Sequence, residues 1–175
     1  MSAKTYWIHN GVMATTAAPA KQPTGATIRT MMQLAPAVPM RVIEWAVSFD
    51  GSAAATPGIM ELIDTGTVAA VITNAYAVAD IQPYGDPNAP ANTSGTGGVP
   101  FGLGTSLSGY ASAAGTEGTP TATRMGGLGL IAPTNQYEKQ LPLAREFEVP
   151  AGHILRIRAT FAATVNMLCY ILAEV

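Results

Sequence analysis

Few side chains in this sequence have the type and spacing that catalysis or metal binding requires. The two histidines, His9 and His153, lie near opposite ends of the chain, and neither has a cysteine or a second histidine at ligand spacing. A metal ion would therefore need distant carboxylates as further ligands. A solvated or hydrogen-bonded histidine is the commoner case, so the sequence predicts no metal site and no other cofactor.

The carboxylates are scattered along the chain, and any two of them could meet in the fold. Those considered are Asp50, Glu61, Asp64, Asp80 and Asp86. A carboxylate pair for glycoside hydrolysis is therefore not ruled out by the sequence. Glycosidase clefts usually also carry aromatic platforms, and one of the only two tryptophans, Trp45, fits an inward-facing position. A hydrolase is accordingly the weakest of the functions considered.

Two motifs of small residues also fail as catalytic signatures. The segment GTSLSG, residues 104–109, has the wrong spacing for a nucleophile elbow. The glycines at 126, 127 and 129 do not form a phosphate-binding loop, because no Lys-Ser or Lys-Thr pair follows them. They are typical of a strand that bulges or lies close to another backbone. The sequence therefore predicts a protein that is not an enzyme.

The composition indicates a surface that is poor in charge. Charged residues make up 11% of the chain, against roughly 25% in an average soluble protein. Either partners or small neutral side chains must cover much of this surface. The net charge of -2 and the lack of a basic run argue against nucleic-acid binding. Cys169, the only cysteine, excludes an intrachain disulfide and is interpreted as a small buried hydrophobic residue.

The chain has no segment typical of secretion or of a membrane span. Its start, MSAKTYWIHNGV, lacks the apolar stretch and the cleavage site of a signal peptide. In the middle of the chain, the longest stretch without charge or proline, Thr65–Ala79, has about half of the ~20 apolar residues that cross a bilayer. We therefore expect a soluble protein that is made in a cytoplasm and has no membrane partner.

The clearest structural pattern lies in Met40–Thr65, MRVIEWAVSFDGSAAATPGIMELIDT, which joins two strand-like runs through a loop of small residues. In the first run all side chains of one parity are apolar: Ile43, Trp45, Val47 and Phe49. Side chains alternate between the two faces of a strand, so this run has one apolar and one wettable face. We interpret the apolar face as part of the inner wall of a sandwich.

Other runs predict strands at residues 26–34, 59–63 and 68–76, the last of which is also compatible with a helix. Near the C-terminus, Leu155–Phe161 alternates, with Arg156 and Arg158 on its polar face. Val165–Ala173 is apolar on both faces, which predicts a strand that is central in a sheet or covered by another subunit. About eight strands, unequal loops and no convincing helix predict an all-β, jelly-roll type β-sandwich that spans residues 26–175 as one domain.

Residues 1–25 have two prolines, Pro19 and Pro23, and no periodicity, which predicts an extended N-terminal arm. Tyr6, Trp7 and Ile8 would give this arm an apolar tip that lies across a neighbouring protein. The alternative is an extended lead-in whose Trp7 packs on its own domain. The sequence leaves both interpretations open.

Residues 82–120 form a long excursion rich in Gly, Pro, Ser and Thr, with only two charged residues, Asp86 and Glu117. Inside a compact domain, such a segment is more often an ordered loop that contacts a partner than a flexible linker. The tripeptide Asn92-Thr93-Ser94 fits the N-glycosylation pattern, which matters only in a secretory pathway. Four apolar side chains are candidate anchors: Phe101, Leu103, Leu107 and Tyr110. The arm and the excursion together give six predicted partner contacts: Tyr6, Trp7, Ile8, Tyr84, Phe101 and Tyr110.

Three stretches carry a resemblance to a known family: RVIEWAVSFDG at 41–51, IMELIDTGT at 59–67 and the ending VPAGHILRIRATFAATVNMLCYILAEV. Over residues 26–175 the chain resembles the small jelly-roll virion proteins that decorate or cement the heads of tailed bacteriophages. Similar chains also occur among tail and base-plate components, and a carbohydrate-binding β-sandwich is a further alternative.

The resemblance implies a location on the capsid surface, after synthesis in the host cytoplasm, with no cofactor. It also implies a homotrimer that sits across the seams between major capsid proteins and stabilises the mature head lattice. The arm Ser2–Thr24 and the excursion Gln82–Pro120 are then the segments expected to contact neighbours.

Overall fold

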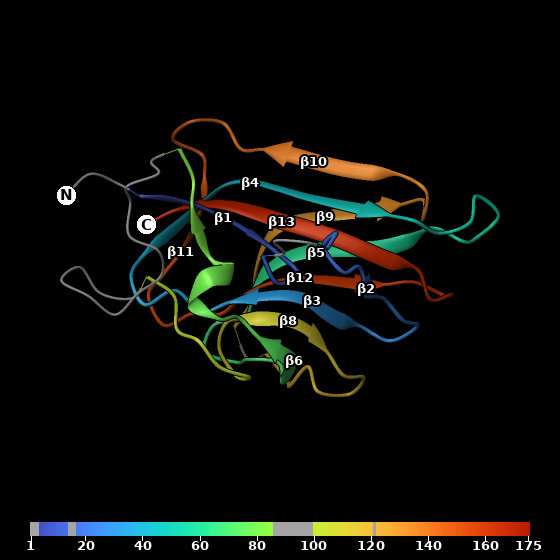
Figure 1. The fold of residues 1–175 in the computed structure, drawn as a ribbon, viewed down its shortest axis with the longest axis horizontal. Coiled ribbons are helices and arrows are strands. Elements are labelled where there is room, and N and C mark those ends of the chain that lie inside the picture. The colour runs from blue at the N-terminus through green and yellow to red at the C-terminus, as the bar shows by residue number, and fades with distance from the viewer. Residues whose placement is uncertain (1–3, 14–16, 86–99, 121) are drawn as a thin grey trace.

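The chain folds into a sandwich of two antiparallel β-sheets (Figure 1). This computed structural model describes residues 4–13, 17–85, 100–120 and 122–175. Within these ranges the chain forms thirteen strands and one short 3₁₀ turn, η1 (Val78–Asp80). The predicted all-β sandwich is confirmed. No helix in the same ranges is long and apolar enough to cross a bilayer.

One sheet has seven strands in the order β10-β4-β13-β1-β7, with β11 also paired to β4 and β2 to β13. Its strands are β1 (Thr5–His9), β2 (Gln22–Pro23), β4 (Met40–Phe49), β7 (Gln82–Pro83), β10 (Gln136–Gln140), β11 (Phe147–Val149) and β13 (Asn166–Glu174). The other sheet has six strands in the order β6-β8-β3-β12-β5-β9. These are β3 (Arg29–Leu34), β5 (Gly58–Asp64), β6 (Ile72–Ala75), β8 (Gly109–Ser112), β9 (Arg124–Ile131) and β12 (Leu155–Thr160).

The chain crosses repeatedly between the two sheets. β3 lies in the six-stranded sheet, β4 in the seven-stranded sheet and β5 in the six-stranded sheet again. The same alternation recurs over β11, β12 and β13. Such crossings are typical of sandwiches of the jelly-roll type, in which hydrogen-bonded neighbours are far apart in sequence.

The core lies between the sheets and follows the predicted alternation. β13 buries one side-chain parity, namely Val165, just before it, and Met167, Cys169, Ile171 and Ala173. This strand has β4 on one side and β1 on the other, so the prediction of a central strand is confirmed. Burial raises the pKa of the Cys169 thiol, as expected for a cysteine that acts as a buried hydrophobic residue.

A bulge in β4 modifies the predicted inner wall. Trp45 and Val47 are buried as predicted. The pairing of β4 with β13 shifts by one residue at Ile43, which is only partly buried. Before this bulge the buried residues are Met40 and Val42, because the extra residue reverses the parity of the strand.

The glycines of β9 let the two sheets approach each other around Trp45. A Cβ atom on Gly127 would stand 2.4 Å from Cζ2 of Trp45, far inside van der Waals contact. A Cβ atom on Gly126 would stand 2.9 Å from Cδ1 of Phe147. The register between β9 and β5 also shifts beside these glycines. The prediction of a bulged and closely approached strand is therefore confirmed.

The N-terminal segment is part of the sandwich and not a separate arm. Thr5–His9 forms β1, which pairs with β13 on one side and β7 on the other. Tyr6 and Ile8 are buried because they share the inward-facing parity of this strand. Trp7 packs on its own domain, against Tyr170. The boundary predicted at residue 26 is corrected, since the sandwich already includes β1.

The described part of the predicted excursion also belongs to the sandwich. Residues 86–99, which include the glycosylation pattern, lie outside the described ranges. From residue 100 onward the chain forms a β-bridge at Phe101 and then strand β8. Of the predicted anchors, Phe101 and Tyr110 are buried and Leu103 packs against the core, whereas Leu107 is exposed.

The strand predicted at residues 68–76 is shorter than expected, because only its second half forms β6. Ahead of β6, the backbone of Ala70 hydrogen-bonds in both directions to the side chain of Gln33. The carbonyl of Val68 accepts a hydrogen bond from Arg156. Side chains therefore satisfy part of this stretch of backbone, and the carbonyls of Thr65 and Thr116 accept the N–H groups of Val68 and Val71.

Candidate functional site

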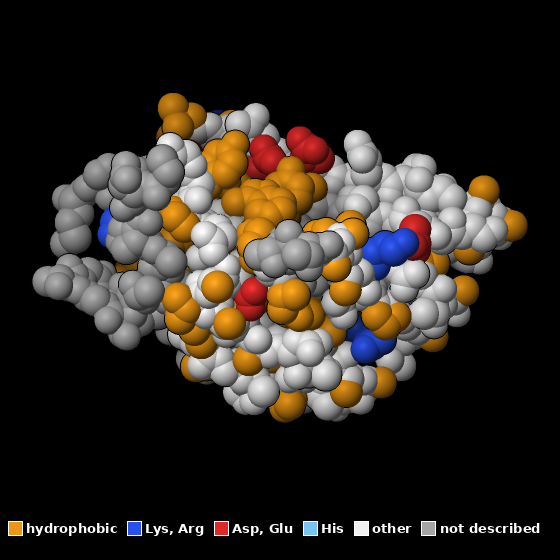
Figure 2. All heavy atoms as spheres, in the orientation of Figure 1, with side chains coloured by type: hydrophobic (Ala, Val, Ile, Leu, Met, Phe, Trp, Pro, Cys, Tyr) orange, Lys and Arg blue, Asp and Glu red, His pale blue; other side chains and the backbone are white. Residues whose placement is uncertain are grey.

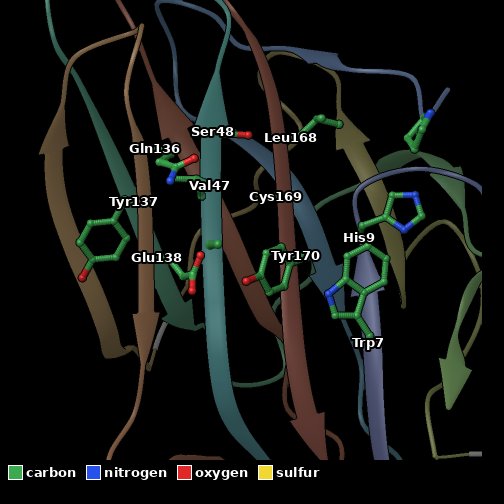
Figure 3. Close-up of a pocket in the computed structure, with 12 residues that line it drawn as sticks. Trp7, His9, Val47, Ser48, Gln136, Tyr137, Glu138, Leu168, Cys169 and Tyr170 are labelled. Carbon is green, nitrogen blue, oxygen red and sulfur yellow. The ribbon is translucent and has the colours of Figure 1, made fainter. Parts of the chain in front are cut away.

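A hollow on the outward face of the seven-stranded sheet is the strongest candidate for a binding site, and we name it the outer groove. Its residues come mainly from four adjacent strands, β10, β4, β13 and β1 (Figure 3). The cavity volume is about 240 Å³. Side chains that line it include Trp7, His9, Gln136, Glu138, Leu168 and Tyr170.

The pairing register explains why this face is hollow. Glu138, Ala46, Tyr170 and His9 are successive partners across β10, β4, β13 and β1. Residues directly opposite each other in a sheet point to the same face. Ala46 has the only small side chain in this row. It therefore forms a floor between the carboxylate of Glu138 and the aromatic rings.

Three aromatic rings form one wall of the outer groove. The ring centroids of Trp7 and His9 are 5.2 Å apart with 28° between the planes, and those of Trp7 and Tyr170 are 5.5 Å apart with 34° between them. The hydroxyl of Tyr170 donates to Oε1 of Glu44 at 2.5 Å, which fixes this ring. Burial, this bond and the negative charges of Glu44 and Glu138 raise the pKa of Tyr170. The phenol is therefore a neutral group.

His9 is buried beside the outer groove. It is 5% exposed, and both of its ring nitrogens are buried. Burial lowers the pKa of His9, an effect that the nearby backbone of Val12 and the charge of Asp80 oppose. The neutral imidazole has one N–H donor and one nitrogen acceptor.

The opposite wall of the outer groove is polar and comes from β10. Figure 2 shows this face as a patch of hydrophobic side chains with acidic side chains beside it, over β4 and β10. No lysine or arginine of the described chain lines the groove. Tyr137 turns the other way and packs on Trp45, with ring centroids 5.2 Å apart. The side chains that β10 presents to the groove are therefore Gln136 and Glu138.

A second cluster surrounds the buried carboxylate of Asp64. Asp64 accepts hydrogen bonds from Arg124 at 2.6 and 3.1 Å and from the N–H of Gly66 at 2.9 Å, and it lies 3.1 Å from Nδ1 of His153. Burial alone would raise the pKa of Asp64, but these bonds together lower it below its usual value. Sequence reasoning missed this cluster because its carboxylate and imidazole are 89 residues apart.

The Asp64 cluster lacks the remaining parts of a catalytic or metal site in the described chain. In an Asp–His pair the carboxylate can orient the histidine as a catalytic base. A hydrolase with such a pair also needs a nucleophile that is hydrogen-bonded to the other ring nitrogen of the histidine. No hydroxyl or thiol of the described residues bonds His153. No group of three or more His, Cys, Asp or Glu side chains that could hold a metal is found in these ranges. Arg124 also bonds the carbonyl of Glu148 at 2.6 Å, so the cluster links β5, β9 and β11.

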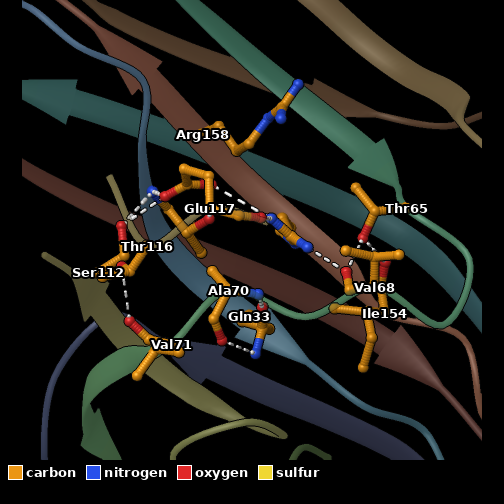
Figure 4. Close-up of polar contacts among 12 residues, drawn as sticks. Gln33, Thr65, Val68, Ala70, Val71, Ser112, Thr116, Glu117, Ile154 and Arg158 are labelled. Carbon is orange, nitrogen blue, oxygen red and sulfur yellow. Dashed lines mark hydrogen bonds and ion pairs between the residues drawn. The ribbon is translucent and has the colours of Figure 1, made fainter. Parts of the chain in front are cut away.

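A buried ion pair between Arg156 and Glu117 fastens the loop after β8 to the six-stranded sheet (Figure 4). Nη1 of Arg156 donates to the carbonyl of Glu117 at 2.8 Å and to its Oε2 at 3.2 Å. The carboxylate also accepts bonds from the N–H and hydroxyl of Thr30 and from the hydroxyl of Ser112, each at 2.6 Å. Arg156 lies on the polar face of β12, as the alternation predicts, but this loop covers that face and buries the side chain.

β9 is an edge strand with apolar side chains on its outward face. Within the described ranges it pairs with β5 on one side only. Leu128 and Leu130 are 62% and 74% exposed, and Met125 and Ile59, the partner of Leu130 on β5, are exposed as well. We name these four residues the β9 patch. Arg124 is the only charged residue of the strand. Soluble β-proteins usually protect such edges with charges, so this surface is suited to a partner.

The structure divides the six predicted partner contacts into two groups. Four of them are buried in the core, and their prediction as contacts is wrong: Tyr6, Ile8, Phe101 and Tyr110. These large side chains fill the space between the sheets, where burial of apolar area stabilises the fold. Trp7 lines the outer groove and Tyr84 is 57% exposed. Contact with a partner stays a prediction for these two.

Three of the other carboxylates noted in the sequence have structural partners, and Asp86 lies outside the described residues. Asp50 forms an ion pair with Lys21, and Glu61 forms one with Arg158 at 2.9 Å. Asp80 is buried and accepts hydrogen bonds from two backbone N–H groups at 2.9 and 2.8 Å. These bonds connect neighbouring strands and loops.

Sequence reasoning did not assemble the outer groove, although part of its signal is present. In TYWIH, residues 5–9, Tyr6 and Ile8 alternate with Trp7 and His9, which is the pattern of a short strand. That pattern could have identified β1 and its outward aromatic residues. It could not have shown which strands lie beside β1.

Comparison of the chain with protein-family models, with curated proteins and with solved structures gave no match. Function is therefore inferred from the outer groove, the β9 patch and the composition.

Proposed function

We propose that this protein is a virion structural protein, which decorates the outside of a tailed-phage head and stabilises the mature lattice. The β9 patch is the observation that carries this proposal. It combines an edge strand that is unpaired in the described structure with a row of exposed apolar side chains. In a free monomer such an edge promotes aggregation, whereas in an assembly the major capsid protein or a second copy of the chain covers it.

The low charge content supports the same role. Charged residues make up 11% of the chain, and several described ones are used in internal ion pairs. A homotrimer across the seams between major capsid proteins would bury much of the remaining neutral surface. Contacts that exist only in the mature lattice stabilise that lattice by linkage. Many copies multiply a modest affinity per site.

Binding to purified heads tests the proposal. Recombinant chain is added to mature phage heads that lack it, and the bound fraction is measured by sedimentation. We expect binding to mature heads and a higher melting temperature of those heads. The double variant Leu128→Lys/Leu130→Lys should bind at least about tenfold more weakly, because it places charges in an apolar contact.

The matched control is Leu143→Lys, which changes an exposed leucine outside the β9 patch. This variant should bind as the wild type does. Failure of the wild-type chain to bind mature heads would refute the proposed function. Equal binding by the double variant would show that another surface makes the contact.

A further inference from the structure

The aromatic wall of the outer groove presents an apolar surface to a ligand. Trp7 and Tyr170 lie side by side with 34° between their ring planes, and Figure 3 shows them next to His9. The faces of aromatic rings carry partial negative charge. C–H bonds next to oxygen atoms carry partial positive charge, so such a wall attracts the C–H face of a sugar ring.

The other side of the groove offers both donors and acceptors of hydrogen bonds. Gln136 has an amide that donates and accepts, and the carboxylate of Glu138 accepts. Both of these side chains are exposed, whereas the ring nitrogens of the neighbouring His9 are buried.

We propose that the outer groove binds a single ring of a neutral carbohydrate. The C–H face of the ring stacks on Trp7 and Tyr170, and its hydroxyls bond Glu138 and Gln136 on the opposite wall. Hydroxyl groups both donate and accept, which matches this mixed set of side chains. The volume of about 240 Å³ lies below the roughly 300–1,000 Å³ of sites for drug-sized ligands, as expected for one sugar ring.

A cationic ligand is the alternative, because ammonium and guanidinium groups also bind aromatic faces and carboxylates. Such a ligand offers donors only. It would leave the donor group of Gln136 without a partner in the complex. Glu138 is the only carboxylate that lines the groove in the described chain. The mixed donor and acceptor set therefore favours hydroxyl groups over a cation.

This site is separate from the surface that carries the decoration role. The outer groove lies on the seven-stranded sheet, and the β9 patch lies on the six-stranded sheet. A sugar on the head surface and a lattice contact through β9 are therefore compatible. Either proposal can fail without the other.

Titration of the full chain with methyl glycosides tests the site. The methyl pyranosides of glucose, galactose, mannose and N-acetylglucosamine are followed by protein NMR shifts and tryptophan fluorescence. We expect one of them to bind with a dissociation constant on the order of 1 mM, which is typical of so small a ligand. Raising the salt concentration should leave this affinity unchanged, because the ligand is neutral.

Two variants locate the binding. Ala46→Ile fills the floor of the groove from its outward face, and Trp7→Ala removes the stacking surface. Each should weaken sugar binding by at least about tenfold. Gln140→Ala, on the same face of β10 but outside the groove, is the matched control and should bind normally. Glu138→Ala, at an exposed position, serves if either groove variant fails to fold, and it should also weaken binding.

Three results would overturn the proposal. The first is that none of the four glycosides binds at about 50 mM, well above the expected dissociation constant. The second is that folded Ala46→Ile binds as the wild type does. The third is that tetramethylammonium binds in place of the sugars, with an affinity that falls as salt increases, which would assign the groove to cations.

Discussion

The buried pair of Arg156 and Glu117 gives the sharpest stability prediction. In Glu117→Gln the side chain keeps its size but loses its charge. The guanidinium of Arg156, which is fully buried, then keeps only neutral partners: the carbonyls of Glu117 and Val68. Breaking one side of a buried ion pair typically costs about 3–5 kcal/mol, because the other charge stays in a poorly solvated site. That is a large part of the ~5–15 kcal/mol that stabilises a typical domain.

The assay is urea unfolding at neutral pH, followed by tryptophan fluorescence and far-ultraviolet circular dichroism. The double variant Glu117→Gln/Arg156→Met should be more stable than Glu117→Gln alone, because it removes the uncompensated charge. Glu138→Gln, an exposed control, should change the free energy of unfolding by less than about 0.5 kcal/mol. A decrease in the free energy of unfolding of less than about 1 kcal/mol for Glu117→Gln would refute the reasoning. So would a double variant whose change in this free energy equals the sum of the changes in the two single variants.

Three further predictions concern packing and pH. Gly127→Ala should lower the free energy of unfolding by about 1–3 kcal/mol, because the added methyl group crowds Trp45. Gly129→Ala should cost less, because the flexible end of the Met60 side chain faces it. Equal costs for the two variants in urea unfolding would contradict this prediction. Because the pKa of Asp64 is lower in the folded protein than its unfolded value of about 3.9, its stabilisation is present above pH ~4 and is lost as the pH falls through the folded pKa. The free energy of unfolding of Asp64→Asn should therefore fall less steeply in acid than that of the wild type. Parallel plots of this free energy against pH for the two proteins would contradict the stabilising role of the Asp64 cluster. The lowered pKa of His9 predicts that stability declines as the pH falls below about 6.5, and this decline should be absent in His9→Gln.

Much of the fold could be predicted from alternation along single strands. Val165–Ala173 is apolar on both faces, which predicted a central strand, and β13 indeed lies between β4 and β1. The glycines of β9 indicated a close approach, which Gly127 makes to Trp45. These features depend on residues that are adjacent in sequence.

The errors arose where tertiary contacts override the local pattern. Arg156 alternates with apolar neighbours and is nevertheless buried, because the loop that carries Glu117 covers it. Tyr6 and Ile8 lie in a proline-containing segment that looks like an arm, but they fill the core because β1 adds to β13. The outer groove depends on the register of four strands. Its floor, Ala46, has no distinguishing feature in the sequence.

The two candidate surfaces lead to different experiments. The β9 patch is apolar and lies on an edge strand, which suits a protein contact. The outer groove is a hollow on a sheet face with mixed hydrogen-bonding groups, which suits a small ligand. Variants at Leu128 and Leu130 should therefore leave glycoside binding intact, and Ala46→Ile should leave head binding intact.

The most direct test of the central claim is the copy number of this chain in purified virions. Quantitative mass spectrometry would measure it relative to the major capsid protein. If the chain decorates the mature lattice, its copy number should stand in a fixed ratio to that of the major capsid protein. Immature particles should lack the chain. Absence from virions, or only a few copies per particle as in a tail component, would contradict the account.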